Sequence, residues 1–274
     1  MEIMDTYKPK RWAFGIFIAC LGLLLGLSGC ANKFDSIAGR SELVTESDET
    51  GERKRARIRL ELAVGYFEQG KTTIALDEIK QAILADPAFS DAYSLRGLIY
   101  MRLNDYAFAE ESFNKALSVT PKNADVMHNL GWLKCQQAAY PQAFALFEKA
   151  VAEPLYAEKA KTLRTLGLCQ ERAGMLAEAQ TSLLKSYELD AGNPVTGYNL
   201  ANILLKRSDF VRAQFYIRQL NNSELANAES LWLGIKIEKR LSSLDAVQQL
   251  ATQLERRFPQ SPETALYRRG AFNE

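Results

Sequence analysis

Residues 90–123, SDAYSLRGLIYMRLNDYAFAEESFNKALSVTPKN, contain the pattern that decides the fold of this chain. Within this stretch Gly97 and Ala109 are small residues among large apolar ones, and Pro121 stands near the end. Another proline, Pro87, lies 34 residues before Pro121. Apolar residues at helical spacing, repeated with this period, predict two helices in each unit.

Each marked position has a physical reason. The glycine or alanine at the eighth position and the alanine at the twentieth lie where the two helices of a unit cross, because a larger side chain there would hold the backbones apart. Large apolar residues at the seventh, eleventh and twenty-fourth positions fill the space between units. Proline ends the second helix, since it lacks an N–H group and disfavours helix in the residue before it.

The whole pattern resembles the tetratricopeptide repeat, a helix–turn–helix unit. Because no unit buries its apolar face alone, stacking of neighbouring units stabilises such an array. The sequence therefore predicts an all-α, right-handed superhelical solenoid of about six repeats over residues 53–274, with a cap at its C-terminal end. The repeats are expected near residues 56–89, 90–123, 124–159, 160–193, 194–227 and 228–261.

The N-terminal segment has the features of a lipoprotein signal peptide. Three basic residues precede an uncharged stretch over residues 12–27, which is shorter than the roughly 20 residues that cross a bilayer as a helix. The string LSGC at residues 27–30 resembles the bacterial lipobox, in which the cysteine is lipidated and becomes the new N-terminus. We therefore expect residues 1–29 to be removed and Cys30 to carry a covalent lipid, with no other cofactor. The alternative is a plain signal peptide or an uncleaved anchor.

The residues after Cys30 bear on location. Ala31 and Asn32 stand where an aspartate tends to retain lipoproteins at the inner membrane. The lipobox resemblance therefore implies the outer membrane of a Gram-negative bacterium, with the protein facing the periplasm. Residues 30–52 are rich in Ser, Thr and acidic residues and predict a flexible tether. The basic cluster over residues 53–59 has two interpretations, contact with lipid head groups or a partner, and a solvated first helix that balances the preceding acidic run.

Charge and composition exclude several classes of function. The formal net charge is +1, so no strong field directs the chain to nucleic acid. A single histidine, His128, cannot supply a His-rich metal site, and no Gly-rich phosphate loop or Gly-x-Ser-x-Gly elbow is present. We expect no catalysis, no metal and no small-molecule substrate. An enzyme is an alternative only if polar residues converge from distant units.

Two cysteines remain in the repeats. Cys135 occupies the twelfth position of the first helix in the third unit, and Cys169 occupies the tenth position in the fourth. Equivalent helices of adjacent units pack side by side, which can bring the two Cα atoms within the roughly 4.4–6.8 Å that a disulfide requires. Because the periplasm is oxidising, we predict this disulfide. The alternative is two buried, unpaired cysteines that pack as small apolar groups.

The first helix of each unit (helix A) lines a concave groove in tetratricopeptide families, through its second, fifth, ninth, twelfth and thirteenth residues, and an Asn at the sixth position often holds a peptide backbone. The corresponding residues here are Asp125, His128, Asn129, Trp132, Cys135, Gln136, Lys161, Arg164, Leu168, Glu171, Arg172, Tyr198, Asn199 and Asn202.

Trp132 is the strongest candidate, because repeat packing does not require a tryptophan there and a groove-wall aromatic with an N–H group is a good binding anchor. The alternative is that Trp132 only packs against the neighbouring helix A. His128 either contacts the partner or is an exposed imidazole without a role. A competing site is the apolar face of the first unit near Tyr66 and Phe67.

Four local strings make the resemblance more specific: HNLGWL at 128–133, PLY at 154–156 beside a two-residue insertion, LRTLGLC at 163–169 and SLWLGI at 230–235. With the lipobox and the tether, the chain resembles the type IV pilus biogenesis and stability lipoproteins, the PilF/PilW pilotins. That resemblance implies an outer-membrane adaptor that binds the secretin subunit, assists its localisation or multimerisation, and keeps pilus fibres stable. The alternative is an adaptor for cell-wall enzymes or for another envelope machine.

Overall fold

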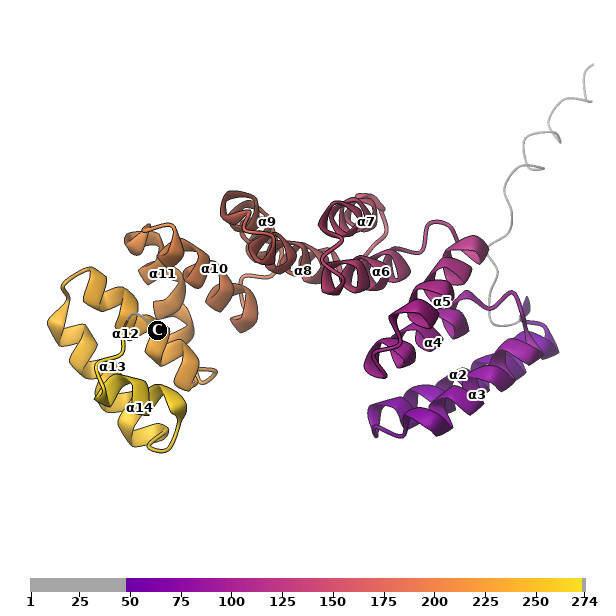
Figure 1. Cartoon of the computed structure of the whole chain (residues 1–274), viewed down its shortest axis with the longest axis horizontal. Helices are drawn as coiled ribbons and strands as arrows, with labels where there is room; N and C mark the ends of the chain where they lie inside the picture. The colour runs from indigo at the N-terminus through magenta and orange to yellow at the C-terminus, as the bar shows by residue number, and fades with distance from the viewer. Residues whose placement is uncertain (1–47, 273–274) are drawn as a thin grey trace, which may run out of the picture. The chain divides into compact units, whose positions relative to one another are not determined.

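Residues 48–272 are described by the computed structural model, and this part of the chain contains thirteen α-helices and no strand (Figure 1). The helices are α2 (Gly51–Glu68), α3 (Thr72–Ala85), α4 (Ser90–Arg102), α5 (Tyr106–Val119), α6 (Ala124–Gln136), α7 (Tyr140–Ala152), α8 (Lys159–Arg172), α9 (Leu176–Leu189), α10 (Pro194–Lys206), α11 (Phe210–Asn221), α12 (Ala228–Arg240), α13 (Leu244–Arg257) and α14 (Pro262–Arg268). They pack as six successive pairs, from α2 with α3 to α12 with α13. The predicted all-α solenoid of tetratricopeptide repeats is confirmed.

The predicted crossing points are close contacts between the helices of a pair. A Cβ atom added to Gly97 would lie 2.5 Å from Phe113 Cε1, and one added to Gly131 would lie 2.9 Å from Phe147 Cε1. Both phenylalanines are fully buried. Glycine at the eighth position therefore lets the second helix bring a large ring against the backbone of the first.

A left-handed backbone conformation marks the turn inside every pair. The residues with positive φ at these turns are Gly70, Asn104, Ala138, Gly174, Ser208 and Ser242. They recur with the repeat period, except that the step from Ala138 to Gly174 is two residues longer. The insertion predicted before the fourth unit is therefore accommodated between pairs, in the turn that separates α7 from α8.

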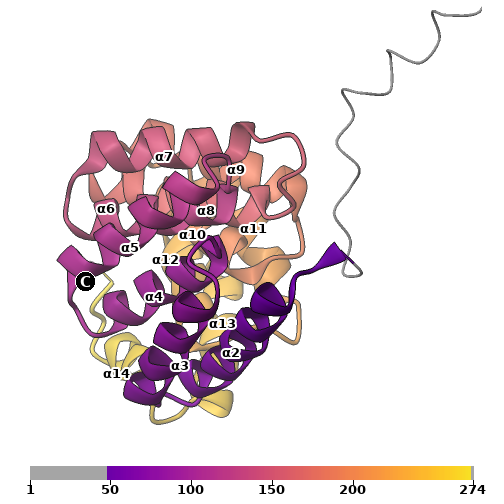
Figure 2. The ribbon, with the colours of Figure 1, turned by 90° about the vertical axis from the view of Figure 1, so that its right-hand side faces the viewer.

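Helices A and helices B (the second of each pair) lie on different sides of the array. Each helix A approaches the next closely along the backbone, from α2 with α4 to α10 with α12, whereas the backbones of successive helices B stay farther apart within the described residues. In Figure 2, α7 and α9 accordingly lie outward of α6 and α8. We call the side formed by the second, fifth, ninth, twelfth and thirteenth residues of helices A the inner face.

The array begins slightly earlier than the sequence predicts. Helix α2 starts at Gly51, inside the segment expected to be tether as far as residue 52. The Thr50 side chain accepts a hydrogen bond from Arg53 N at 3.2 Å, which caps the helix. The basic cluster pairs within the array: Arg53 bonds Asp86, and Arg59 Nη1 lies 2.7 Å from Glu78 Oε2. These pairs favour the solvated-helix interpretation of the cluster.

The last helix, α14, packs on the sixth helix pair. Helix α14 contacts α12 and α13, and its Leu266 and Tyr267 join an apolar cluster that includes Leu254. Between residues 48 and 272 no helix combines the length and apolar character needed to cross a bilayer. The predicted signal peptide, the lipidated Cys30 and most of the tether lie outside the described residues.

Candidate partner-binding face

Trp132 is half-buried on the inner face, between α6 and α8. The guanidinium carbon of Arg172 lies 4.9 Å from the centroid of the Trp132 ring, and Arg172 Nη1 donates to Gln136 Oε1 at 3.4 Å. The ring also packs against the buried cluster that contains Phe147 and Leu166. Trp132 therefore packs against the neighbouring helix A, as one of the two interpretations from the sequence expects. Part of its surface is also exposed to solvent.

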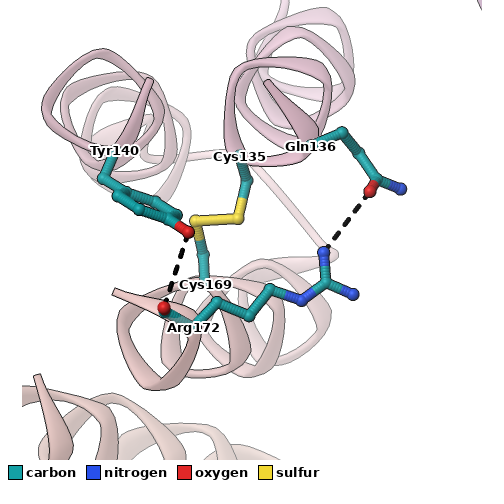
Figure 3. The surroundings of a disulfide bond; sticks show 5 residues. All are labelled: Cys135, Gln136, Tyr140, Cys169 and Arg172. Atoms are coloured by element: carbon teal, nitrogen blue, oxygen red, sulfur yellow. Dashed lines mark hydrogen bonds between the residues drawn. A yellow bond between two sulfur atoms is a disulfide. The ribbon is translucent and has the colours of Figure 1, made fainter. Parts of the chain in front are cut away.

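A disulfide joins Cys135 of α6 to Cys169 of α8 (Figure 3). Both cysteines belong to the buried cluster against which Trp132 packs. The two Cα atoms are 5.9 Å apart, and both side chains are almost completely buried. The expected place of Cys135 in the groove lining is therefore corrected, because the disulfide takes its side chain into the core. Tyr140 and Arg172 flank the bond, with the Tyr140 hydroxyl donating to Arg172 O at 3.5 Å.

His128 is not on the surface, so both interpretations made from the sequence are wrong. Its side chain is 7% exposed, and Nδ1 lies 2.8 Å from Thr162 Oγ1. Burial, together with the positive charges of Lys161 and Arg164, lowers the pKa of His128 to about 4. The imidazole is therefore neutral at pH 7 and has a structural role between α6 and α8.

The segment with the two-residue insertion is linked to His128 through Thr162. Tyr156, in the turn before α8, is 9% exposed, and its hydroxyl lies 2.8 Å from Thr162 Oγ1. Tyr156, Thr162 and His128 thus form one hydrogen-bonded chain across three segments. The PLY string carried a signal for this contact, but sequence spacing alone did not show where the tyrosine folds back. The preceding Leu155 is 99% exposed.

The predicted asparagines do not form one row of free amides. Asn199 Nδ2 donates to Val195 O of its own helix at 2.7 Å, so this donor is already used. Asn129 and Asn202 are half-buried, and no hydrogen bond of either side chain is found within the described part of the chain. Arg164, half-buried, lies close enough to act on the His128 pKa.

Tyr198, on the inner face of the fifth unit, lies within the electrostatic influence of acidic residues from other helices. Burial raises the pKa of Tyr198, and the carboxylates of Glu229, Glu263 and Glu171 raise it as well. These acids come from α12, α14 and α8, so three helices place negative charge around one phenol. Glu171 also pairs with Lys206 Nζ at 2.6 Å. The inner face is therefore polar and charged, with aromatic side chains set into it.

The competing site predicted from the sequence, at Tyr66 and Phe67, lies near the C-terminal end of α2. The Arg102 guanidinium lies 3.6 Å from the Phe67 ring centroid, and Lys71 Nζ lies 5.8 Å from that of Tyr66. Both rings are half-buried. This competing site has no partner residue in common with Trp132.

Sequence reasoning missed two hollows on the opposite side, between successive helices B. One, of about 410 Å³, lies between α7 and α9 with Leu163 and Gln170 of α8 among its lining residues. The other, of about 440 Å³, lies between α9 and α11 beside Tyr187 and Tyr216. Helix periodicity does not signal them, since they form where the backbones of successive helices B lie apart.

No metal-binding constellation is found in the residues that the structure describes, since no three His, Cys, Asp or Glu side chains gather there. The residues that do converge are aromatic rings, guanidinium groups and amides, which bind other polypeptides through stacking and hydrogen bonds.

The sequence is similar to a known repeat family and to a protein of type IV pilus assembly. Residues 89–152 match the family model of the tetratricopeptide repeat. Type IV pilus assembly protein PilF of Pseudomonas aeruginosa (strain PAO1) is 28% identical over 241 residues, which is 88% of this chain and 93% of PilF.

Two solved structures resemble the array closely. The structure of Pseudomonas aeruginosa PilF has a TM-score of 0.71 at 27% identity, over 81% of this chain and 100% of that one. The structure of PilW, described as a widely conserved type IV pilus biogenesis factor, has a TM-score of 0.69 at 29% identity, over 76% of this chain and 96% of that one.

Proposed function

We propose that this chain, a tetratricopeptide-repeat protein homologous to the type IV pilus biogenesis factors PilF and PilW, is a lipid-anchored adaptor of the outer membrane that binds the secretin subunit of the pilus machinery. In this role it assists localisation and multimerisation of the secretin, and it supports the stability of the pilus fibre. It acts by protein–protein binding and not by catalysis.

The observation that carries the proposal is the match over nearly the full length of PilF, which covers 88% of this chain in sequence and 81% in structure. A match confined to one or two repeats would support only the fold, since such repeats occur in proteins of many functions. The inner face around Trp132, Asn129 and Arg164 supports a binding role, because it combines an aromatic anchor with polar groups.

Anchoring is proposed from the LSGC string at residues 27–30. A lipid on Cys30 would confine the repeats to one membrane surface. Confinement raises the effective concentration of the adaptor near an unassembled membrane subunit, so a modest affinity suffices for capture. The formal net charge of +1 is close to zero. It is consistent with a partner recognised through specific contacts and not through a long-range electrostatic field.

Crosslinking in the native membrane tests the partner. A photo-crosslinking residue is placed at Asn202 on the inner face and, as a matched control, at Lys149 on helix B of the third unit, which is exposed. We expect the Asn202 position to yield the secretin subunit and the Lys149 position to yield much less. Recovery of peptidoglycan enzymes in place of secretin would favour the cell-wall adaptor, and equal yields from both positions would contradict the inner face as the binding side.

A further inference from the structure

One residue of the inner face is buried, although the residues at the same position in the two preceding units are partly exposed to solvent. Trp232 occupies the fifth position of helix A in the sixth unit, which corresponds to Arg164 and Tyr198 in the two preceding units. Those two side chains are half-buried, whereas Trp232 is only 5% exposed. Glu229, one turn earlier on α12, is the second residue of the same unit and so belongs to the inner face as well.

The group that covers Trp232 comes from the end of the chain itself. The Phe272 ring centroid lies 5.3 Å from that of Trp232, with the planes tilted by 32°. Lys239 Nζ lies 3.2 Å from the centroid of the Phe272 ring. Lys236 Nζ lies 5.7 Å from the Trp232 ring centroid, so one lysine of α12 lies against Phe272 and a second lies near the indole that Phe272 packs against.

Phe272 reaches this place through a short turn after the last helix. Gly270 has φ +69°, Ala271 N donates to Leu266 O at 3.0 Å, and Phe272 N donates to Gly270 O at 3.0 Å. Only Gly270 and Ala271 lie between Arg269, the C-cap residue of α14, and Phe272, and neither belongs to a helix. Such a segment can leave its position without unfolding any of the helix pairs.

We propose that Trp232, Lys236 and Lys239 form an aromatic-binding subsite at the C-terminal end of the inner face, and that Phe272 is its displaceable intramolecular occupant. The subsite takes a phenylalanine or tyrosine side chain presented by an extended segment of a partner. This inference goes beyond the proposed function, because it does not depend on which partner the adaptor serves.

The chemistry of the lining supports an aromatic ligand over an aliphatic one. An ammonium group is attracted to the face of an aromatic ring, and tilted or edge-to-face ring pairs gain energy beyond the area that they bury. A leucine would bury similar area but would lose both interactions. Because Phe272 belongs to the same chain, it is present at the subsite at high effective concentration. An external segment can bind only while Phe272 is displaced, so its apparent affinity is its intrinsic affinity multiplied by the fraction of molecules in which the subsite is open.

The test uses the chain's own sequence as the probe. A synthetic peptide RGAFNE, which corresponds to residues 269–274, is titrated into the wild-type chain, Phe272→Leu and Phe272→Ala. The chemical shift of the Trp232 indole N–H is followed by NMR and is assigned with a Trp132→Phe background. The control ligand is the same peptide with alanine in place of phenylalanine.

We expect the peptide to bind Phe272→Ala at least about tenfold more tightly than the wild-type chain, with Phe272→Leu between them. The alanine peptide should leave the Trp232 resonance unchanged in all three chains. The proposal is overturned if the phenylalanine peptide shifts this resonance in none of the folded chains, because Phe272 would then be only a core residue of the cap. The Leu variant keeps the apolar volume, so the comparison stands even if Phe272→Ala does not fold.

Discussion

Ala138 adopts a backbone conformation that its side chain disfavours. Its φ is +57°, in the left-handed region, at the turn between the two helices of the third unit. The fourth unit has Gly174 at the equivalent turn, with φ +80°. A Cβ atom in this region approaches the following carbonyl oxygen, at a cost of roughly 1–2 kcal/mol, which glycine avoids.

Replacing Ala138 by glycine should therefore stabilise the protein by about 1 kcal/mol, less the added freedom of glycine in the unfolded chain. Gly174→Ala is the matched control and should lower the free energy of unfolding by a similar amount. Urea denaturation measures both values. A loss of stability in Ala138→Gly would show that the turn carries no such strain.

His128 makes stability depend on pH. Its folded pKa is about 4, below the unfolded value of about 6.5, so the unfolded chain binds more protons in this interval. The contribution is complete above pH 6.5 and is lost as the pH falls towards 4. The loss is on the order of 3 kcal/mol for a fully buried group.

We expect the free energy of unfolding of the wild-type chain to fall more steeply from pH 7 to pH 4 than that of His128→Gln, which has no group titrating there. Urea denaturation at a series of pH values measures the difference between the two slopes. Parallel curves would mean that the buried imidazole is already protonated or is accessible to solvent.

At the scale of the helices, the close approach of α6 and α7 depends on Gly131. An alanine there would bring its Cβ to 2.9 Å from Phe147, a fully buried ring, so the helices or the ring must shift. Gly65 in α2 offers the opposite environment, with no atom within 4 Å of an added Cβ. The same substitution therefore has opposite expected effects at the two positions.

Gly131→Ala should destabilise the chain by roughly 1–3 kcal/mol through overpacking, despite the better helix propensity of alanine. Gly65→Ala should stabilise it by up to about 1 kcal/mol, since only the propensity term remains. Thermal unfolding followed by circular dichroism compares the two variants. A stabilising Gly131→Ala would show that the pair can separate without cost.

The disulfide holds two consecutive helices A together. Removing it as Cys135→Ala with Cys169→Ala should lower the free energy of unfolding by roughly 2–4 kcal/mol, because the unfolded chain gains freedom when a loop of 34 residues opens. Wild-type protein treated with a reductant should lose stability to the same extent, and the double variant should not respond. Two free thiols on unreduced, denatured protein would contradict the bond.

At the scale of the whole molecule, binding is expected to concentrate on few residues of the inner face. Trp132→Ala should weaken partner binding by on the order of 2 kcal/mol, because large aromatic side chains dominate interface energies. Lys149→Ala, exposed on helix B of the same unit, should change the affinity little. Binding is measured by titration of the partner segment recovered by crosslinking.

The melting temperature of Trp132→Ala serves as the control, since a variant that unfolds would say nothing about binding. If the folded variant binds as the wild-type chain does while Tyr66→Ala loses affinity, the site lies on the first unit and the inner face near Trp132 is not the binding side.

The solenoid could be predicted from the sequence, because every contact that defines it recurs with the period. Gly97 and Gly131 meet Phe113 and Phe147 at the same offset along the chain, so one unit predicts the next. Contacts between neighbouring units are equally local, which is why composition and spacing were sufficient. The disulfide follows from the same regularity, since cysteines in adjacent helices A lie at similar heights.

Only the tertiary structure decided which inner-face positions are open. His128 is buried and shares Thr162 as a hydrogen-bond partner with Tyr156 of the insertion, and Trp232 is covered where Phe272 turns back from the cap. Tyr156 and Phe272 lie in segments that have no counterpart in other repeats. Periodicity predicts contacts that recur in every unit, but it carries no information about where a segment that occurs once will pack.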